Sequence, residues 1–404
     1  MNNTLVLLTA AFPYGSSEPF LETEITYLAQ GFNRVVIITA DTKNTNIRAL
    51  PPNCEVLRMD IDFTVKLRLK SLLNYLNPLV KEELTTVEKA YRLQPSKSIL
   101  KTMLISLERG EKTAQFIAQQ HFNYATTVFY SYWCDDTALG LALLSQKQLI
   151  KAVSRIHGWD SYFERSPINY LPFRQFITEH LRQIISISQN GIDYAATHWQ
   201  VDKNKFLLSR LGINGQQQLD LQKGNEFTIM SCSNIIPLKR VHLIADALHQ
   251  ITDYKIKWIH FGDGTDMPTL KTRLTTLPGN IKATLRGRIP NVEIYAAYHA
   301  EKPHLFINVS SSEGVPVSIM EAMSFGVPCM ATNVGGNGEI VTNENGCLLP
   351  STPSADLIAQ EIKRFIGMSS ATYTQYSNAA FQTWNTAYNA AQNYTALVNN
   401  LKSL

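Results

Sequence analysis

Two glutamates eight positions apart, Glu313 and Glu321, are the residues whose type and spacing most clearly suggest chemistry. The short apolar run at 304–309 before them is typical of a buried parallel strand. The run at 316–325 predicts a helix, because a proline stands at its start and a Gly-x-Pro sequence follows its end. Glu313 is therefore expected on the loop that leaves a strand, and Glu321 about two turns into the next helix. In open α/β sheets, ligands bind at the carboxyl ends of the strands, where such loops lie.

The first turn of that helix is expected to bind an anion. Its leading backbone amides point free N–H groups and the positive end of the helix dipole at whatever lies before them. An acid beside a diphosphate cradle, with a second acid further along the same helix, suits a nucleotide sugar. Besides Glu321, the residues predicted to bind this donor here are Gly314, Val315, Pro316, Val317 and Ser318.

The two acids resemble the E-x7-E motif of retaining nucleotide-sugar glycosyltransferases, in particular glycosyltransferase family four (glycosyl transferases group 1). The sequences Gly326-Val327-Pro328 and Gly335-Gly336 extend this resemblance. It implies that Glu313 orients the donor sugar and Glu321 binds the ribose hydroxyls. It also implies the GT-B architecture, in which two Rossmann-like α/β domains face each other across a cleft and the last helix crosses back to the first domain. The alternative is that both acids are solvated surface charges.

A cationic segment ends another strand, at Asn234 and Lys239-Arg240. The resemblance implies that Lys239 neutralises the departing diphosphate. Family members usually have an arginine where this chain has Asn234, so either Arg240 supplies the missing charge or phosphate binding depends more on the helix amides. Arg286 and Arg288 are further candidates to reach the cleft. Because cations at a helix start are mildly unfavourable, the pair suggests a use. The alternative is a solvated helix start.

Two further motifs follow strands. His157 and Asp160 match an H-G-x-D motif, and His157 is predicted to hydrogen-bond a sugar hydroxyl from the first domain, with Asp160 on the acceptor side. The alternative for His157 is a histidine satisfied at a strand end. Gly262 lies in a Gly-Asp-Gly sequence that resembles the family's G-x-G turn, and it is either a donor contact or simply a tight turn.

The first loop of the chain holds Tyr14 and Gly15, which are predicted to contact the acceptor. Glu22 and Glu24 follow in a helix, and they are read either as acceptor contacts or as exposed helix charges. No Asp-x-Asp metal motif stands at a strand end, so no metal or other cofactor is expected besides the nucleotide-sugar substrate.

The order of elements predicts a parallel sheet in each half of the chain. Apolar runs alternate with helical patterns, which indicates doubly wound α/β domains. A polar stretch near 210–225 marks the boundary. The predicted domains are 1–212 on the acceptor side, completed by a C-terminal helix at about 380–404, and 213–379 for the nucleotide sugar. Strands are expected at 4–10, 35–39, 127–130, 152–156, 184–188, 227–233, 256–261, 281–286, 304–309 and 328–332, and a continuous helical pattern at 371–404.

Composition narrows the functional classes. The 404 residues carry a formal net charge of +4, and no basic block suggests a nucleic-acid partner. Five cysteines without C-x-x-C spacing favour a reduced, cytoplasmic protein. The segment 65–81 mixes lysines with leucines, which predicts either a membrane-surface helix at the inner face or an ordinary core-facing helix.

The sequence thus predicts a retaining glycosyltransferase. It would move a hexosyl unit from a UDP- or GDP-sugar to a hydroxyl of a glycan or lipid-linked acceptor, in bacterial surface polysaccharide synthesis. The rival hypotheses are a nucleotide-sugar epimerase or hydrolase of the same fold and a catalytically silent partner subunit. A nicotinamide oxidoreductase is disfavoured because no strand is followed by G-x-G-x-x-G.

Overall fold

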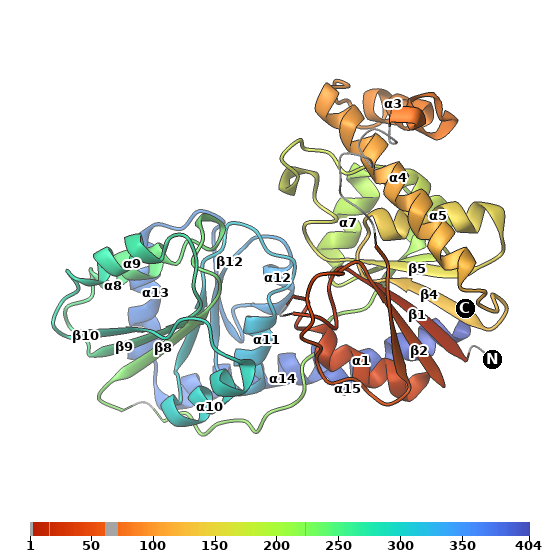
Figure 1. Cartoon of the computed structure of the whole chain (residues 1–404). Helices are drawn as coiled ribbons and strands as arrows, with labels where there is room; N and C mark the ends of the chain where they lie inside the picture. Colours follow the sequence, from red (N-terminus) through yellow and green to blue (C-terminus); the bar gives the residue numbers. More distant parts are fainter. Residues whose placement is uncertain (1–2, 16, 61–71, 223) are drawn as a thin grey trace. The chain divides into compact units, whose positions relative to one another are not determined.

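The structure is a computed structural model that describes residues 3–15, 17–60, 72–222 and 224–404. The chain forms two compact units, Met1–Leu211 with Ala390–Leu404, and Gly212–Asn389. Each unit is an α/β domain built on a parallel sheet (Figure 1).

The first unit contains a seven-stranded parallel sheet among its described residues, in the order β3-β2-β1-β4-β5-β6-β7. The strands are β1 (Thr4–Thr9), β2 (Arg34–Thr39), β3 (Cys54–Arg58), β4 (Thr127–Ser131), β5 (Lys151–Ile156), β6 (Gln183–Ser186) and β7 (Phe206–Leu208). The helices are α1 (Leu21–Gly31), α3 (Pro78–Lys89), α4 (Lys97–Gln119), α5 (Asp136–Lys147), α6 (Arg174–His180), α7 (Gln189–His198) and α15 (Ala390–Ser403), with 3-10 turns η1 (Leu72–Leu76), η2 (Phe163–Arg165) and η3 (Lys203–Lys205).

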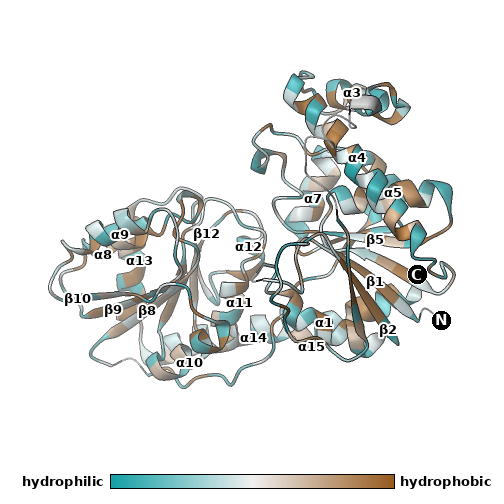
Figure 2. Cartoon of the chain, in the orientation of Figure 1, coloured by the Kyte–Doolittle hydropathy of each residue, from teal (hydrophilic) through white to brown (hydrophobic). Residues whose placement is uncertain are grey.

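Alternating residues of β1 face two separate cores, as the period of a strand requires. Leu5 and Leu7 pack with α1 and α15 on one face, and Val6 and Leu8 pack with α4 and α5 on the other. All four side chains are fully buried. Figure 2 shows this as hydrophobic colouring along β1 and as mixed colouring on α4, which has one face in the core. Helix α15 therefore completes the first unit, although it follows the second unit in the chain.

The second unit contains a six-stranded parallel sheet in the order β10-β9-β8-β11-β12-β13 among its described residues. The strands are β8 (Phe227–Cys232), β9 (Ile256–Phe261), β10 (Ile281–Leu285), β11 (Leu305–Asn308), β12 (Cys329–Thr332) and β13 (Gly346–Leu349). The helices are η4 (Pro237–Lys239), α8 (His242–Leu248), α9 (Met267–Leu274), α10 (Asn291–Glu301), α11 (Val317–Ser324), α12 (Asn337–Ile340), α13 (Ala355–Gly367) and α14 (Ser370–Ala387).

Helices cover both faces of this second sheet. On one face, α8 and α13 bury Ile244 and Ile358 against Ile229 of β8 and Ile307 of β11. On the other, Phe325 at the end of α11 stacks on Tyr298 of α10, with the ring centroids 4.5 Å apart. The C-terminal end of α11 is thus anchored to α10.

The predicted α/β architecture with two Rossmann-like units is confirmed, with differences at three edge strands and at the C-terminus. The sequence analysis did not predict β3, β7 or β13. The helical pattern expected at 371–404 breaks at Tyr388 and Asn389, where Ile213 donates its amide to the Tyr388 carbonyl at 3.0 Å. The units divide after Leu211, next to the expected boundary, and the chain returns to the first unit at Ala390, later than the expected 380.

Candidate functional site

Glu313 lies on the loop after β11 and is the centre of the candidate site. Its side chain is 7% exposed. Its Oε1 accepts hydrogen bonds from Lys239 Nζ at 2.5 Å, Ser310 Oγ at 2.6 Å and Asn308 Nδ2 at 3.2 Å. Within the described part of the chain, no donor is assigned to Oε2. The three donors therefore fix the carboxylate and leave one oxygen available.

Lys239 reaches Glu313 from the turn η4, which follows β8. The ion pair joins the ends of two neighbouring strands of the sheet, and the lysine side chain is 19% exposed. A partly buried pair with a short contact costs desolvation and repays it only when both partners are well hydrogen-bonded, as Glu313 is here. Lys239 and Glu313, which the sequence analysis assigned to the phosphate and to the sugar, thus contact each other.

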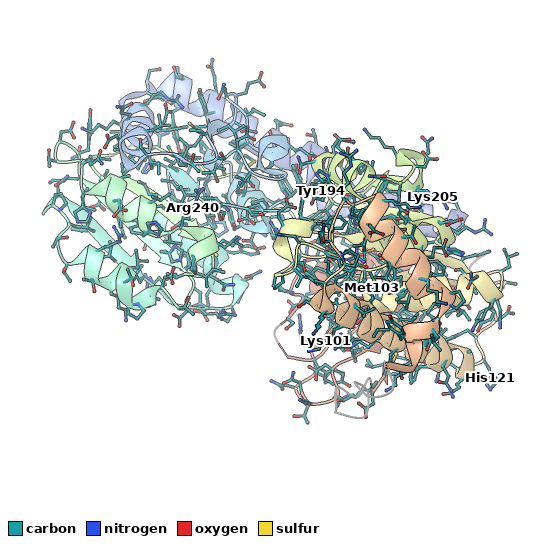
Figure 3. The ribbon with its side chains drawn as sticks, turned by 90° about the horizontal axis from the view of Figure 1, so that it is seen from above. Lys101, Met103, His121, Tyr194, Lys205 and Arg240 are labelled. Atoms are coloured by element: carbon teal, nitrogen blue, oxygen red, sulfur yellow. The ribbon has the colours of Figure 1, made fainter. Side chains whose placement is uncertain are left out.

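Arg240, next to Lys239, has its guanidinium occupied by backbone. Its Nε donates to the Val309 carbonyl and its Nη2 to the carbonyls of Ser310 and Ser351, each at 2.8 Å. Arg240 lies within the second unit in Figure 3 and has a left-handed backbone, with φ of 47°. Arg240 thus ties the loop after β11 to the loop after β13, and its role in donor binding stays a prediction.

Two glycines support the Glu313 loop from the opposite side. A Cβ on Gly335 would lie 1.9 Å from the Glu313 carbonyl oxygen, and the residue has φ of 52°. The Gly336 amide donates to the Gly314 carbonyl at 2.7 Å. Only glycine fits such an approach of backbone to backbone at positive φ. The Gly-Gly sequence therefore packs directly under the residues that carry the candidate chemistry.

Replacing Gly335 with alanine is expected to displace the Glu313 loop and to destabilise the second unit by about 1–3 kcal/mol. Thermal unfolding of the full chain measures this change. Gly279→Ala is the matched control, because a Cβ there meets nothing within 4 Å. An unchanged melting temperature in Gly335→Ala, equal to that of the control, would show that the loop tolerates the methyl group.

Glu321 is buried inside α11 and faces α10. Its exposed fraction is 4%, and its Oε1 accepts from the Tyr295 hydroxyl at 3.2 Å and from Asn291 Nδ2 at 3.4 Å. Burial raises the pKa of Glu321 to about 7, and the Tyr295 hydrogen bond only partly offsets that effect. Glu321 thus lies in the helix that follows the Glu313 loop, and its pKa is close to neutral pH.

Residues at the carboxyl ends of β8, β9 and β10 converge as well. Arg288 Nη2 donates to Asn234 Oδ1 at 3.0 Å, and both residues are exposed. Gly262 donates its amide to the Gly287 carbonyl at 2.8 Å. A Cβ on Gly262 would lie 1.9 Å from the Ser233 carbonyl oxygen, and its φ is 137°. Gly262 thus brings the Asn234 and Arg288 loops together.

His157 ends β5 of the first unit and is enclosed by aromatic rings. It is 8% exposed, with its ring centroid 4.4 Å from that of Trp133 and 4.7 Å from that of Tyr132. Its Nδ1 lies 3.8 Å from Asp160 Oδ2, beyond hydrogen-bond distance. Neither ring nitrogen has a hydrogen-bond partner among the described residues. This differs from a histidine satisfied at a strand end.

Asp160 holds the loop after β5. It is fully buried and accepts backbone amides from Cys134 at 3.1 Å, His157 at 2.9 Å and Gly158 at 3.1 Å. Burial by itself would raise the pKa of Asp160, but His157 and these amides hold it below its ordinary value. A carboxylate with these contacts fixes the backbone of the loop, and the acceptor-side role of Asp160 stays a prediction.

The first loop, after β1, packs against the segment near residue 46. Tyr14 is 9% exposed, and the Gly15 amide donates to the Asn46 carbonyl at 3.1 Å. The reading of Glu24 as an exposed charge is wrong. Glu24 is fully buried and forms an ion pair with Arg155 of β5, with Arg155 Nη1 2.5 Å from Glu24 Oε2.

Part of the predicted membrane-surface segment, 65–71, lies outside the described residues. In the described ranges, no helix combines the length and apolar character that a membrane crossing needs. Likewise, no group of three or more His, Cys, Asp or Glu side chains in those ranges is arranged to hold a metal ion. All five cysteines are free thiols.

The sequence analysis missed three side chains that shape the site. Asn308 orients Glu313, and Asn291 and Tyr295 contact Glu321. The hydroxyls at 310–312 are near Glu313 in sequence and were interpreted as loop-capping groups, and Ser310 Oγ donates to Glu313 Oε1. The α10 residues carry no such local signal.

Comparison with known proteins adds family evidence. Residues 216–383 match the family described as Glycosyl transferases group 1. The chain is 26% identical over 240 residues to the GtfA subunit of the UDP-N-acetylglucosamine–peptide N-acetylglucosaminyltransferase of Streptococcus parasanguinis, covering 58% of this chain and 45% of that protein. It is 28% identical over 169 residues to an α-1,3-galactosyltransferase of Escherichia coli that acts on a GlcNAc-diphosphoundecaprenol, covering 40% and 39%. The chain spans about half the length of the curated relatives it matches.

Solved structures resemble the whole chain in fold. A glycosyltransferase from Rickettsia africae superposes with a TM-score of 0.67 at 15% identity, covering 100% of this chain and 98% of that one. Anabaena HepE, solved with UDP and glucose, superposes with a TM-score of 0.63 at 17% identity, covering 99% of each chain. The chain therefore has the GT-B fold, and residues 216–383 of its second unit match the model of the glycosyl transferases group 1 family.

Proposed function

We propose that the protein is a retaining glycosyltransferase that moves a hexosyl unit from a nucleoside diphosphate sugar to a hydroxyl of a glycan or lipid-linked acceptor. One observation carries the proposal. Glu313 and Lys239 meet at the carboxyl ends of β11 and β8, directly before the first turn of α11, and Glu321 lies further along that helix. This arrangement offers positive charge, a sugar-facing carboxylate and a ribose-binding acid on one sheet edge.

The departing diphosphate is the group that needs most stabilisation, because its negative charge grows as the glycosidic bond breaks. Lys239 and the leading amides of α11, at Val317 and Ser318, supply fixed positive charge there. Arg288, held by Asn234, is the proposed source of the charge that an arginine at position 234 would otherwise give.

Glu313 is assigned to the donor sugar. Its Oε1 is held by three protein donors, so Oε2 is the oxygen that accepts from a sugar hydroxyl. The bond from the anomeric carbon to the phosphate oxygen breaks while the acceptor oxygen bonds to the same face of that carbon. The acceptor proton passes to the departing phosphate oxygen. His157, with no protein hydrogen-bond partner among the described residues, is assigned to a sugar hydroxyl.

One of the two relatives supports the acceptor class. The E. coli relative acts on a diphosphoundecaprenol-linked sugar, whereas the S. parasanguinis relative acts on a peptide, by their names. We propose a lipid-linked or glycan acceptor in surface polysaccharide synthesis, with the protein at the cytoplasmic face of the membrane.

The direct test is to incubate the full chain with UDP- and GDP-hexoses, with and without lipid-linked glycan acceptors, and to follow release of the nucleoside diphosphate. NMR of the product gives the anomeric configuration. Acceptor-dependent release with retained configuration is the expected result. Release without any acceptor, or epimerised donor, would replace the proposal with a hydrolase or an epimerase. Binding without turnover of any donor would favour a silent partner subunit.

Binding of the nucleoside diphosphate is expected to weaken as the pH falls below about 7. The ionised carboxylate of Glu321 accepts hydrogen bonds from two ribose hydroxyls through its two oxygens, whereas the protonated acid has a weaker acceptor and one oxygen that donates, and burial raises its pKa to about 7. Raising the pH through that value therefore creates the binding form, and lowering it removes that form. If only the ionised form binds, affinity at pH 6 should be about tenfold below that at pH 8.

Calorimetric titration of UDP and GDP into the full chain at pH 6, 7 and 8 measures this dependence. Glu321→Gln is the control, because its amide does not titrate and any remaining pH dependence belongs to the phosphates or to other groups. Equal pH profiles for the wild type and the variant would separate Glu321 from nucleotide binding.

A further inference from the structure

A cavity of about 500 Å³ lies wholly within the first unit and is not part of the site described above. It is enclosed by α4, the start of α5 and the segment 159–174. Its size falls within the range of small-molecule sites. Helix α4 turns Met103 into the core and Lys101 to solvent, both labelled in Figure 3. A third stripe, with Thr102, Ser106 and Arg109 at helical spacing, faces the cavity.

An aromatic surface borders the cavity. Trp159 is 47% exposed, which is unusual for so large a ring. It packs against Trp133, with the ring centroids 5.2 Å apart and the planes at 41°. Trp133 thus packs against the Trp159 indole, and about half of the Trp159 side chain remains exposed to solvent. Flat aromatic faces of this kind pack against the C–H face of a pyranose ring and lose little conformational entropy on binding.

Fixed polar groups stand along the α4 and α5 side of the cavity. Arg109 Nη1 lies 2.8 Å from Asp136 Oδ2, and Ser106 Oγ donates to Asp136 Oδ1 at 2.5 Å. The arginine and aspartate side chains are each 22% exposed. A pre-oriented guanidinium and carboxylate present donors and acceptors side by side, which suits neighbouring hydroxyls of a sugar.

Positive charge exceeds negative charge in the lining. The lining contains three arginines and two aspartates, namely Arg109, Arg165, Arg174, Asp135 and Asp136. Burial and the neighbouring Asp136 raise the pKa of Asp135 to about 7, which reduces the negative charge further near neutral pH.

Arg174 is built into the wall of the cavity. It is 2% exposed, and it donates to the carbonyls of Pro172 and Asp160, each at 3.0 Å. Its buried Nε has no hydrogen-bond partner among the described residues. A buried guanidinium with an N–H that lacks an acceptor is costly without a ligand, so the cavity favours an anion.

We propose that this cavity binds an anionic pyranose, a sugar that carries a carboxylate or phosphate group, and that this sugar is part of the acceptor. The last part rests on the glycosyltransferase function proposed above. The sugar ring stacks on Trp159, its hydroxyls meet Arg109 and Asp136, and its anionic group meets Arg165 and Arg174.

Calorimetric titration of the full chain tests the proposal with three probes: methyl β-D-glucuronide, α-D-glucose 1-phosphate and neutral methyl β-D-glucoside. At least one anionic sugar should bind about tenfold or more tightly than the neutral one, since charge-assisted hydrogen bonds are the stronger ones. Tighter binding of the glucuronide indicates a uronic acid, and tighter binding of the phosphate indicates a sugar phosphate. Equal affinity for all three, or no binding, overturns the proposal.

Variants locate the site. Trp159→Ala should abolish binding of the anionic sugar, and Arg165→Gln should remove the preference for anions. Arg182→Gln, an exposed arginine of the same unit outside the cavity, should change neither. Anionic binding that survives both cavity substitutions would place it elsewhere and refute the assignment. UDP titrated in parallel reports on the second unit, so loss of UDP binding and loss of sugar binding identify failures of different proposals.

Discussion

Replacing Lys239 with alanine should lower kcat by about 10²–10³-fold, the effect of losing one preorganised donor to developing negative charge. Lys239 is the last residue of η4, which follows β8, and its side chain is only 19% exposed, so solvent replaces the ammonium poorly. Part of the diphosphate charge already exists in the bound donor, and KM should therefore rise as well. Steady-state rates with the intact donor measure both quantities.

Lys282→Ala is the matched control for this substitution. Lys282 lies on β10 of the same unit, and its side chain is 76% exposed. Its removal changes the net charge equally but should leave kcat and KM unchanged. If both lysine variants retained wild-type kcat, Lys239 would serve only to hold Glu313, and charge on the diphosphate would have to be met by other groups.

Replacing Glu313 with glutamine should lower kcat without weakening the binding of the nucleoside diphosphate, unlike the Lys239 substitution. The amide oxygen still accepts from Lys239, Ser310 and Asn308, so the loop keeps its shape, while the sugar-facing oxygen becomes an N–H donor. A donor sugar held in the wrong orientation reacts slowly, and kcat should fall by about 10²-fold. Binding of the free nucleoside diphosphate should remain nearly the same, because the diphosphate does not contact this oxygen.

Calorimetry with the diphosphate alone, set beside steady-state rates, separates the sugar role of Glu313 from a structural role. Glu301→Gln is the control for this substitution. Glu301 pairs with Lys257 near the start of β9, whereas the candidate site lies at the carboxyl ends of the strands. Equal loss of diphosphate affinity in Glu313→Gln and Lys239→Ala would mean that Glu313 mainly supports its loop.

The parts of the fold that sequence predicted well are central strands and the helix after β11. Central parallel strands such as β8, β9 and β11 are continuous apolar runs, because helices cover both faces. The strands that were missed, β3, β7 and β13, all lie at sheet edges. Edge strands are short, and β3 and β7 are partly exposed along their length, so they lack the buried run that identifies a strand.

The candidate site divides along similar lines. Spacing within one segment was enough to single out Glu313 and Glu321. Partners that meet across long separations have no local pattern, as with Lys239 and Glu313, 74 positions apart, or Glu24 and Arg155, 131 positions apart. The backbone partners of Arg240 and Asp160 could not be predicted for the same reason. Backbone carbonyls and amides brought to them by distant loops are invisible to motif reasoning.

The return of α15 to the first unit has a consequence for how the protein is made. A ribosome delivers the first unit's strands early, but Tyr394, Leu397 and Leu401, which complete one of its two cores, are synthesised only after the whole second unit. Until then, the face of the sheet that carries Leu5 and Leu7 lacks part of its cover. The residues of the second unit are contiguous, so its synthesis is complete before α15 of the first unit is made. The nascent chain is thus expected to depart from the usual order in which the N-terminal domain matures before the next.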